Sequence, residues 1–367
     1  MSVSDLVFSS ELASDAAERV PGGAQVGSEA AQQRLDGPGS ADDSASAWTA
    51  ASGSAVLATL EAPSERSEHY ASRSKARATI KAYAAGWRDF LQFCEPRELT
   101  PLPASEQTVA DYLAFLADNG YKAATIATRL VMLSQAHKAA NLPSPTTASL
   151  VRRTHAGIRR TIGTAQQGKA PAVSGDLKRM LSKLPSTRVG MRDRALLLLG
   201  FAGGFRRSEL VALDFDDLEF SSAGLAVTLR RAKNDQEGEG RRIGIPYGSS
   251  ETTCPVRSLQ AWLETARIND GPVFRSLDKF QRVQPRRLSD KAVARVVKRR
   301  AKAVGLDPER YAGHSLRSGL ATSAAAGGAS ERAIMNQTGH RSTSMVRRYI
   351  REANLFAADN AATLAGL

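Results

Sequence analysis

Three short segments in the second half of the chain carry residues that suit chemistry on an anionic group. Arg206 follows a Gly-Gly break, and Glu209 can face its guanidinium across one helical turn. Lys233 begins a polar connector, where a flexible ammonium can reach a substrate. His314 and Arg317 are three residues apart, so at the start of a helix they can face a shared anion. Permanently charged guanidiniums next to an imidazole favour phosphate as that anion.

A fourth segment adds a candidate nucleophile. His340 follows Gly339 and precedes Tyr349 by nine residues, so a tyrosine on the following helix can approach a group that the histidine holds. Taken singly, the four segments have ordinary explanations: a surface ion pair, a solvated lysine, a capping histidine and a core tyrosine. Their combination and order are more specific than any one of them.

Apolar spacing predicts the elements that must position these residues. Beyond about residue 174 it predicts a mainly helical domain with a small β-sheet. The helices are expected near residues 177–184, 191–203, 256–266, 290–304, 315–326, 331–338 and 343–350, and the strands near 225–229 and 242–245. The two strands form a hairpin whose connector carries Lys233.

The preceding part of the chain, residues 70–163, predicts a bundle of four short helices that becomes ordered near Ser74. Ser105 is placed to cap the second helix, which stops at Asn119-Gly120. The fourth helix, residues 148–162, gathers basic side chains into one stripe, namely Arg152, Arg153, Arg159 and Arg160. Such a stripe is usually a solvated face, but residues 122–169 lack acids to pair with it, which favours phosphate contact.

Charge divides the 367-residue chain unevenly. Residues 1–60 hold eight acids and two arginines in a Ser-, Ala- and Gly-rich composition, which predicts a disordered acidic tail. Since the net charge is +13, the remainder carries +19, and this favours a polyanionic partner. Residues 164–173 have linker composition and separate the bundle from the domain at 174–367.

Several classes of protein are disfavoured. The two cysteines, Cys94 and Cys254, are far apart and indicate neither a disulfide framework nor a zinc cluster. The longest apolar run, residues 195–201, is too short to cross a membrane, and no secretory signal is evident. Carboxylates at metal-ligand spacing are missing around His314 and His340. We therefore expect a cytoplasmic protein with no metal, no cofactor and no membrane partner.

Together, the four segments resemble the catalytic domain of the tyrosine recombinases, the phage-integrase-like site-specific recombinases. The family pattern is an arginine in G-x-R-x-x-E-L, a hairpin lysine, H-x-x-R, G-H and a tyrosine about nine residues later. All six positions are filled here, by Arg206, Lys233, His314, Arg317, His340 and Tyr349. The resemblance extends over residues 70–365, where the helical bundle is similar to the family's core-binding domain. It implies a C-shaped clamp on double-stranded DNA.

The resemblance also implies a role for each catalytic position. Tyr349 attacks a phosphodiester and forms a 3′-phosphotyrosyl link, with His314 as the base that takes its proton. Arg206 and Arg317 clamp the non-bridging oxygens, and Lys233 protonates the leaving 5′-oxygen. His340 hydrogen-bonds the phosphate, and Glu209 orients Arg206. Because the phosphotyrosyl link stores the energy of the broken bond, the reaction needs no ATP.

Beyond the catalytic centre, the family implies DNA contacts and self-association. The expected DNA contacts comprise the arginine stripe of 148–162, Arg129, and the run Lys298, Arg299 and Arg300. Four protomers on two DNA sites are expected, with accessory DNA-bending proteins as further partners. Apolar Phe356, Leu364 and Leu367 form a stripe that docks either on a neighbouring subunit or on its own domain.

Two other functions fit parts of the pattern. A type IB topoisomerase-like enzyme uses the same tyrosine attack to relax DNA without pairing two sites. A non-catalytic architectural protein would use the basic faces alone. The complete catalytic set disfavours the second, and the bundle, linker and apolar C-terminal stripe disfavour the first.

Overall fold

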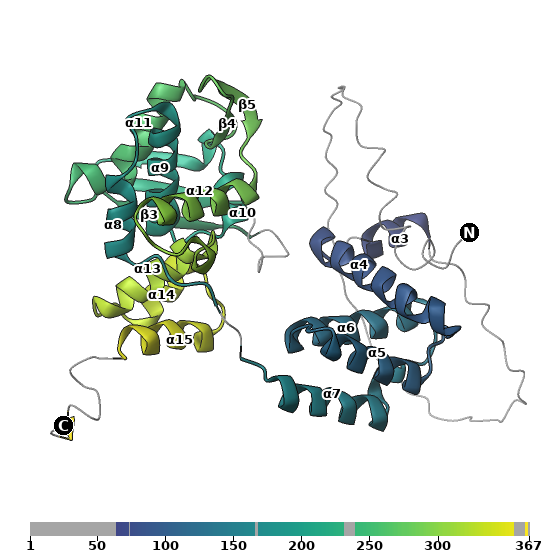
Figure 1. The fold of residues 1–367 in the computed structure, drawn as a ribbon. Coiled ribbons are helices and arrows are strands. Elements are labelled where there is room, and N and C mark those ends of the chain that lie inside the picture. The colour runs from purple at the N-terminus through teal and green to yellow at the C-terminus, as the bar shows by residue number, and fades with distance from the viewer. Residues whose placement is uncertain (1–63, 73, 166–167, 231–238, 356–363, 366–367) are drawn as a thin grey trace, which may run out of the picture. The chain divides into compact units, whose positions relative to one another are not determined.

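The computed structural model describes residues 64–72, 74–165, 168–230, 239–355 and 364–365 (Figure 1). The chain forms two compact units, one ending at Gln166 and the other starting at Gln167, a division that lies within residues 164–173. The acidic segment 1–60 and Lys233 lie outside the described residues, as do Phe356 and Leu367 of the C-terminal stripe. Leu364, which is described, is 73% exposed.

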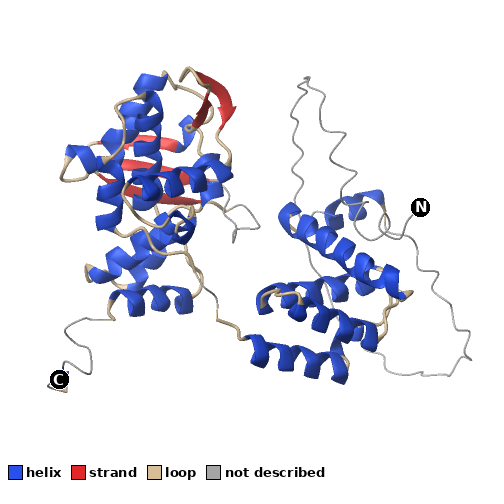
Figure 2. Ribbon diagram, viewed as in Figure 1, coloured by secondary structure: helices blue, strands red, loops and turns tan. Residues whose placement is uncertain are grey.

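The regular elements in the described part of the first unit are helices (Figure 2). They are α3 (Glu65–Ser72), α4 (Arg77–Cys94), α5 (Glu106–Asp118), α6 (Ala123–Ala139) and α7 (Ser149–Ile162), with short 3-10 turns at Glu95–Arg97 and Pro145–Thr147. The last four are the helices that the apolar spacing predicts. The first was missed because its sequence, ERSEHYAS, is almost wholly polar.

Aromatic side chains of α4 and α5 fill the core of this unit. Trp87, Phe90 and Tyr112 are each at most 1% exposed, and the rings of Phe90 and Tyr112 meet edge to face with centroids 4.9 Å apart. The predicted cap is present, since Ser105 Oγ accepts a hydrogen bond from Thr108 N at 3.0 Å. The unit therefore has its own core and its own helix signals.

The second unit is mainly helical with two small antiparallel sheets, so the predicted fold class is confirmed. Its helices are α8 (Ser174–Ser182), α9 (Arg188–Ala202), α10 (Arg207–Ala212), α11 (Pro255–Ala266), α12 (Asp290–Ala303), α13 (His314–Ala326), α14 (Glu331–Thr338) and α15 (Thr343–Ala353). Short 3-10 turns lie at Phe215–Asp217, Glu251–Thr253 and Pro308–Arg310. Apolar α9 packs against α11 and α13 at the centre of the unit.

The larger sheet has the order β1 (Leu218–Ser221), β2 (Gly224–Leu229), β3 (Arg241–Pro246). Opposite pairs such as Val227 and Ile243 point buried side chains into the core, which fixes the register of the predicted hairpin. Strand β1 was not predicted, because four residues with alternating partial burial give too short a pattern.

A second hairpin, β4 (Arg275–Leu277) with β5 (Val283–Arg287), was also missed. Both strands are short, their side chains are partly or fully exposed, and β5 contains a proline, so hydrophobic alternation could not reveal them.

Helices α13, α14 and α15 pack on one another around a small separate core. It contains Ala321, Ala325, Ile334, Val346 and the ring of Tyr349. Gly339 caps the C-terminus of α14, with a left-handed φ of 65° and an N–H that donates to Met335 O at 2.7 Å. A glycine adopts this conformation without a Cβ clash, so the chain can turn sharply towards His340.

Candidate active site

Five of the six predicted catalytic residues are described. Four of them lie at or next to a helix end, and the fifth, Tyr349, lies within a helix. Arg206 immediately precedes α10, His314 and Arg317 are in the first turn of α13, His340 follows α14, and Tyr349 lies in α15. The position of Lys233, outside the described residues, remains a prediction. The structure brings the five together through the contacts described below.

Glu209 holds Arg206 as the spacing predicts. Its carboxylate accepts hydrogen bonds from the backbone N–H of Arg206 at 2.9 Å and from Nη1 of the same residue. The Glu209 side chain is 2% exposed, whereas that of Arg206 is 18% exposed. The carboxylate thus orients the guanidinium from the interior and leaves part of it open to solvent.

Arg317 is the most deeply buried of the five described catalytic candidates, at 1% exposure. Its Nη1 donates to Gly204 O at 2.7 Å and to Thr338 O, while Nη2 has no hydrogen-bond partner among the described residues. Burial, together with Arg206, lowers the pKa of Arg317 to about 10, so it stays charged at neutral pH. A fixed cation with a spare N–H pair is suited to receive an oxyanion.

Tyr349 and His314, the predicted nucleophile and base, lie within hydrogen-bond distance of each other. The phenol oxygen lies 3.2 Å from Nε2 of His314, and Tyr349 is only 6% exposed. Burial raises the pKa of Tyr349, an effect that nearby Arg317 opposes. His314 keeps an exposed surface, but partial desolvation by its neighbours and the charges of Arg317, Arg206 and Arg207 lower its pKa. A neutral imidazole therefore faces a phenol that cannot ionise unaided, which is the arrangement a general base requires.

The ring of His340 also lies near Tyr349. Their ring centroids are 5.9 Å apart, and Nδ1 of His340 lies 2.7 Å from Thr338 Oγ1. Burial and the charges of Arg317 and Arg206 lower the pKa of His340 to about 3. The ring is therefore neutral at physiological pH.

Arg241 is a site residue that the sequence did not reveal. It begins β3, and its guanidinium donates to the carbonyls of Asn336, Gln337 and Thr338 at 3.3, 3.1 and 3.3 Å. One of its nitrogens also lies 3.9 Å from Glu209. Because helix C-termini attract cations, this arginine fastens the hairpin to the end of α14. Only the folded contact between β3 and α14 reveals this role.

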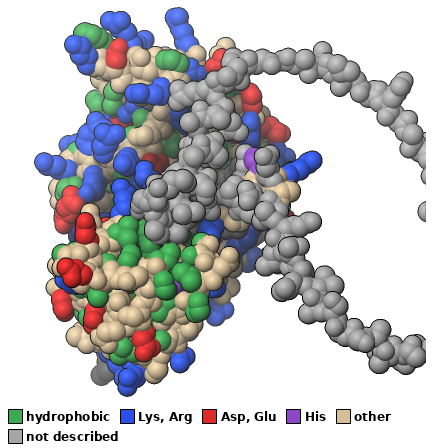
Figure 3. All heavy atoms as spheres, turned by 90° about the vertical axis from the view of Figure 1, so that its right-hand side faces the viewer, with side chains coloured by type: hydrophobic (Ala, Val, Ile, Leu, Met, Phe, Trp, Pro, Cys, Tyr) green, Lys and Arg blue, Asp and Glu red, His purple; other side chains and the backbone are tan. Residues whose placement is uncertain are grey.

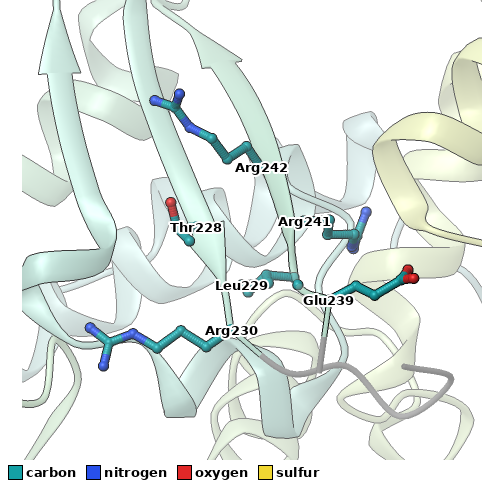
Figure 4. A pocket seen from close by; sticks show the side chains of 7 residues that line it. Thr228, Leu229, Arg230, Glu239, Arg241 and Arg242 are labelled. Carbon is teal, nitrogen blue, oxygen red and sulfur yellow. The ribbon is translucent and has the colours of Figure 1, made fainter. Parts of the chain in front are cut away.

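A pocket of about 430 Å³ lies where the hairpin opens (Figure 4). Strand β2 ends here at Leu229, β3 starts at Arg241, and the connector that carries Lys233 joins them. In Figure 4, Arg241 and Glu239 point to the side of the C-terminal helices, whereas Arg230 and Arg242 point to the other side. The described ends of the hairpin, Leu229 and Arg241, thus place the point where the connector begins and ends next to an arginine that is bound to the site.

The predicted arginine stripe of α7 lies on the surface of the first unit. Val151 and Ile158, two helical turns apart, are buried in the core. The four arginines of the stripe are all exposed: Arg152, Arg153, Arg159 and Arg160. The folded unit therefore leaves these guanidiniums free to meet a polyanion, as the spacing implied.

Two other predicted DNA contacts need correction. Arg300 is 7% exposed and pairs with buried Asp193 at 2.7 Å, so it stabilises the interior rather than a surface. The Arg129 side chain is 14% exposed and pairs with Asp89. Sequence position could not show this, because the acidic partners lie 107 and 40 residues away.

The other two residues of the basic run reach the surface. Arg299 is exposed, and Lys298 is partly exposed with its ammonium bound to Glu309 at 2.9 Å. Among the three residues of the run, Arg299 is therefore the most accessible to a phosphate group.

The described residues show neither a metal cluster nor a membrane-spanning helix. They contain no group of three or more His, Cys, Asp or Glu side chains placed to hold a metal ion. None of their helices is both long and apolar enough to cross a membrane.

Comparison with known proteins agrees with this geometry. Residues 174–355 match the phage integrase family. An integrase/recombinase XerD homolog of Selenomonas ruminantium is 43% identical over 293 residues, which are 79% of this chain and 85% of the relative. A tyrosine recombinase XerC of Corynebacterium glutamicum is 26% identical over 284 residues, which cover 76% of this chain and 82% of that protein.

Solved structures share the fold at low identity. A XerH site-specific recombinase bound to a palindromic difH substrate has a TM-score of 0.60 at 16% identity, covering 82% of this chain and 84% of that one. A Tn1549 transposon integrase in complex with transposon right-end DNA has a TM-score of 0.55 at 15% identity, covering 82% and 96%. The chain belongs to the phage integrase family. Within that family it is a tyrosine-type site-specific recombinase, which the relative at 43% identity supports most directly.

Proposed function

We propose that this recombinase cuts and rejoins double-stranded DNA through a covalent bond between Tyr349 and a 3′-phosphate. The observation that carries the proposal is the 3.2 Å contact between the Tyr349 hydroxyl and Nε2 of His314, next to the buried guanidinium of Arg317. A nucleophile, a base and a fixed cation are the groups that phosphodiester cleavage requires.

In this mechanism Tyr349 Oη bonds to phosphorus while its proton passes to His314 Nε2. The bond from phosphorus to the 5′-oxygen breaks, and Lys233 gives a proton to that oxygen. Arg206 and Arg317 hold the non-bridging oxygens as their negative charge increases. Attack by the 5′-hydroxyl of another strand reverses these transfers and completes strand exchange.

The DNA surface proposed here combines the exposed arginines of α7 with cations of the second unit. Many Lys and Arg side chains lie on the surface drawn in Figure 3. The XerH and Tn1549 proteins, whose folds this chain shares, were solved as complexes with DNA. Both observations support contact with double-stranded DNA.

The proposal extends to assembly and location. Strand exchange between two duplexes uses four active sites, so we expect four protomers on two DNA sites, assisted by accessory DNA-bending proteins. A cytoplasmic location fits an enzyme that acts on DNA. The mass of the complex on DNA with one or two sites measures the assembly directly.

Trapping the covalent intermediate tests the reaction. We would incubate the protein with fragmented DNA from its own genomic neighbourhood, quench with denaturant, sequence the attached DNA and map the modified residue by mass spectrometry. We expect one recurring sequence joined by its 3′ end to Tyr349, and no adduct with Tyr349→Phe.

Tyr311→Phe is the matched control. Its hydroxyl is bound to Asp176 at 2.9 Å and Tyr311 is 6% exposed, so this variant also loses a buried tyrosine hydroxyl. It should form the adduct normally. An adduct that persists in Tyr349→Phe would overturn the assignment of the nucleophile.

A further inference from the structure

Thr338, the last residue of α14, has more contacts within the site than its place before Gly339 and His340 implies. Its hydroxyl oxygen lies 2.5 Å from Ile334 O and 2.7 Å from Nδ1 of His340. Thr338 is 0% exposed, so solvent does not compete for these hydrogen bonds. Its own carbonyl accepts from Arg317 and Arg241.

Counting protons at this hydroxyl fixes the direction of both bonds. A carbonyl oxygen can only accept, so the single hydroxyl proton of Thr338 points to Ile334 O. The hydroxyl oxygen must then accept from His340, which places a proton on Nδ1 of the ring. In a neutral imidazole only one nitrogen is protonated, so Nε2 of His340 carries a free lone pair.

The charges around His340 keep the ring neutral. Arg317, Arg206, Arg241, His314 and the phenol of Tyr349 are the titratable groups that lie against it. The three guanidiniums oppose a further positive charge, and burial acts in the same direction. With DNA absent, nothing in this set favours the doubly protonated ring.

We propose that Thr338 is a positioning residue that fixes the tautomer of His340, so that Nε2 is a proton acceptor in the DNA-free site. The consequence for catalysis rests on the proposed function. A non-bridging phosphate oxygen is itself an acceptor, so the resting tautomer cannot donate a hydrogen bond to it.

Phosphate binding must therefore change the proton arrangement. The ring of His340 first moves away from the buried Thr338 hydroxyl, so that Nδ1 can lose its proton to solvent while Nε2 gains one from solvent. When the ring returns, the Thr338 hydroxyl has turned from Ile334 O and donates to Nδ1. The net number of protons on the ring is unchanged. Only after this exchange does His340 donate through Nε2 to the phosphate.

Nitrogen NMR of histidine-labelled, full-length protein without DNA tests the proposal. The chain has five histidines, and His340→Gln identifies the signals of His340. At neutral pH we expect a pyrrole-type signal for Nδ1 and a pyridine-type signal for Nε2, in the wild type and in Thr338→Ser. In Thr338→Val, which keeps the shape but removes the acceptor, the two types should exchange or average.

Thr322→Val is the matched control, because Thr322 is also buried but lies in α13, away from this hydrogen-bond chain. It should leave the His340 signals unchanged. A pyrrole-type Nε2 in the DNA-free wild type would overturn the proposal, whether or not Thr338→Val folds. The same pattern in wild type and folded Thr338→Val would also overturn it.

Adding target DNA to Tyr349→Phe tests the change of tautomer without cleavage. Nε2 of His340 should become pyrrole-type on binding, and a pyridine-type signal in the bound state would overturn the switch. The DNA-free spectra do not depend on strand cleavage. A protein that shows the expected tautomer but never forms a tyrosyl adduct would therefore contradict the proposed function and leave the tautomer assignment intact.

Discussion

The arginine side chain occurs in opposite surroundings in two regions of the molecule: Arg317 of α13 is buried, whereas the arginines of α7 are exposed. Arg317 is 1% exposed and two backbone carbonyls hold its Nη1, whereas the α7 arginines extend from the surface of the first unit. Burial of a guanidinium costs solvation, and here it gives a cation whose position is already set. Exposed arginines avoid that cost but must be ordered when they bind.

This difference predicts different effects on the reaction. A preorganised charge acts mainly on the transition state, because no reorganisation is needed as the phosphate becomes more negative. Mobile surface charges act mainly on affinity, through release of counterions from DNA. The two sets of arginines should therefore separate cleavage from binding.

Arg317→Lys should give the largest effect. An ammonium cannot serve Gly204 O, Thr338 O and a phosphate oxygen in the geometry of the guanidinium. Single-turnover cleavage should fall by at least ~10²-fold, the usual cost of losing one preorganised donor. DNA affinity, measured in parallel, should change little.

Arg332→Lys, at an exposed position of α14, is the control and should retain the wild-type rate. If Arg317→Lys weakened binding and kept the cleavage rate of the bound complex, Arg317 would be a residue that positions DNA.

Arg152→Gln combined with Arg159→Gln should have the next largest effect. Loss of two phosphate contacts should reduce the slope of log affinity against log salt by about 2 and lower affinity on the order of tenfold near ~0.15 M salt. Cleavage within the saturated complex should be unchanged. Arg88→Gln, at an exposed position of α4, is the control variant. If it reduced the salt dependence of DNA binding as much per residue, α7 would not be a specific contact surface.

The pH dependence of cleavage should sharpen the account of the buried site. The pKa of His314 is lowered from 6.5, so the neutral, proton-accepting form persists below pH 6.5. Between pH 7.5 and pH 6 a histidine with a pKa of about 6.5 would lose roughly three quarters of its neutral form, and the loss of rate should be smaller than this. Single-turnover rates at DNA concentrations well below saturation measure this, because they report the pKa values of the free enzyme, and a midpoint at or above pH 6.5 contradicts it.

Arg300→Gln should have the smallest effect on DNA. Arg300 is buried against Asp193, so the salt dependence of DNA binding should match that of the wild type. The variant should instead lose stability, by about 3–5 kcal/mol, because Asp193 loses one of its two buried arginine partners. Denaturant unfolding and a salt titration separate the two outcomes.

The sequence predicted what depends on local spacing. The helical spacing of apolar residues predicted α5 and α7, and the residue type at the helix start predicted the Ser105 cap. The motifs also placed His314 near Arg317 and His340 near Tyr349. Local spacing could not predict contacts between segments that are far apart in the chain. The burial of Arg300 depends on an aspartate 107 residues away, and the role of Arg241 depends on where α14 ends. Strands β4 and β5 lack the apolar alternation that would have predicted them.

The end of α14 also constrains how the chain can vary in length. Its last carbonyls receive Arg241 and Arg317, and Gly339 then turns the chain to His340. One inserted residue in α14 would rotate these carbonyls by about 100° around the helix axis. Insertions and deletions among related chains should therefore be absent between Ile334 and His340 and tolerated at the exposed turn between β4 and β5, so an alignment can be anchored on α14 even where identity is low.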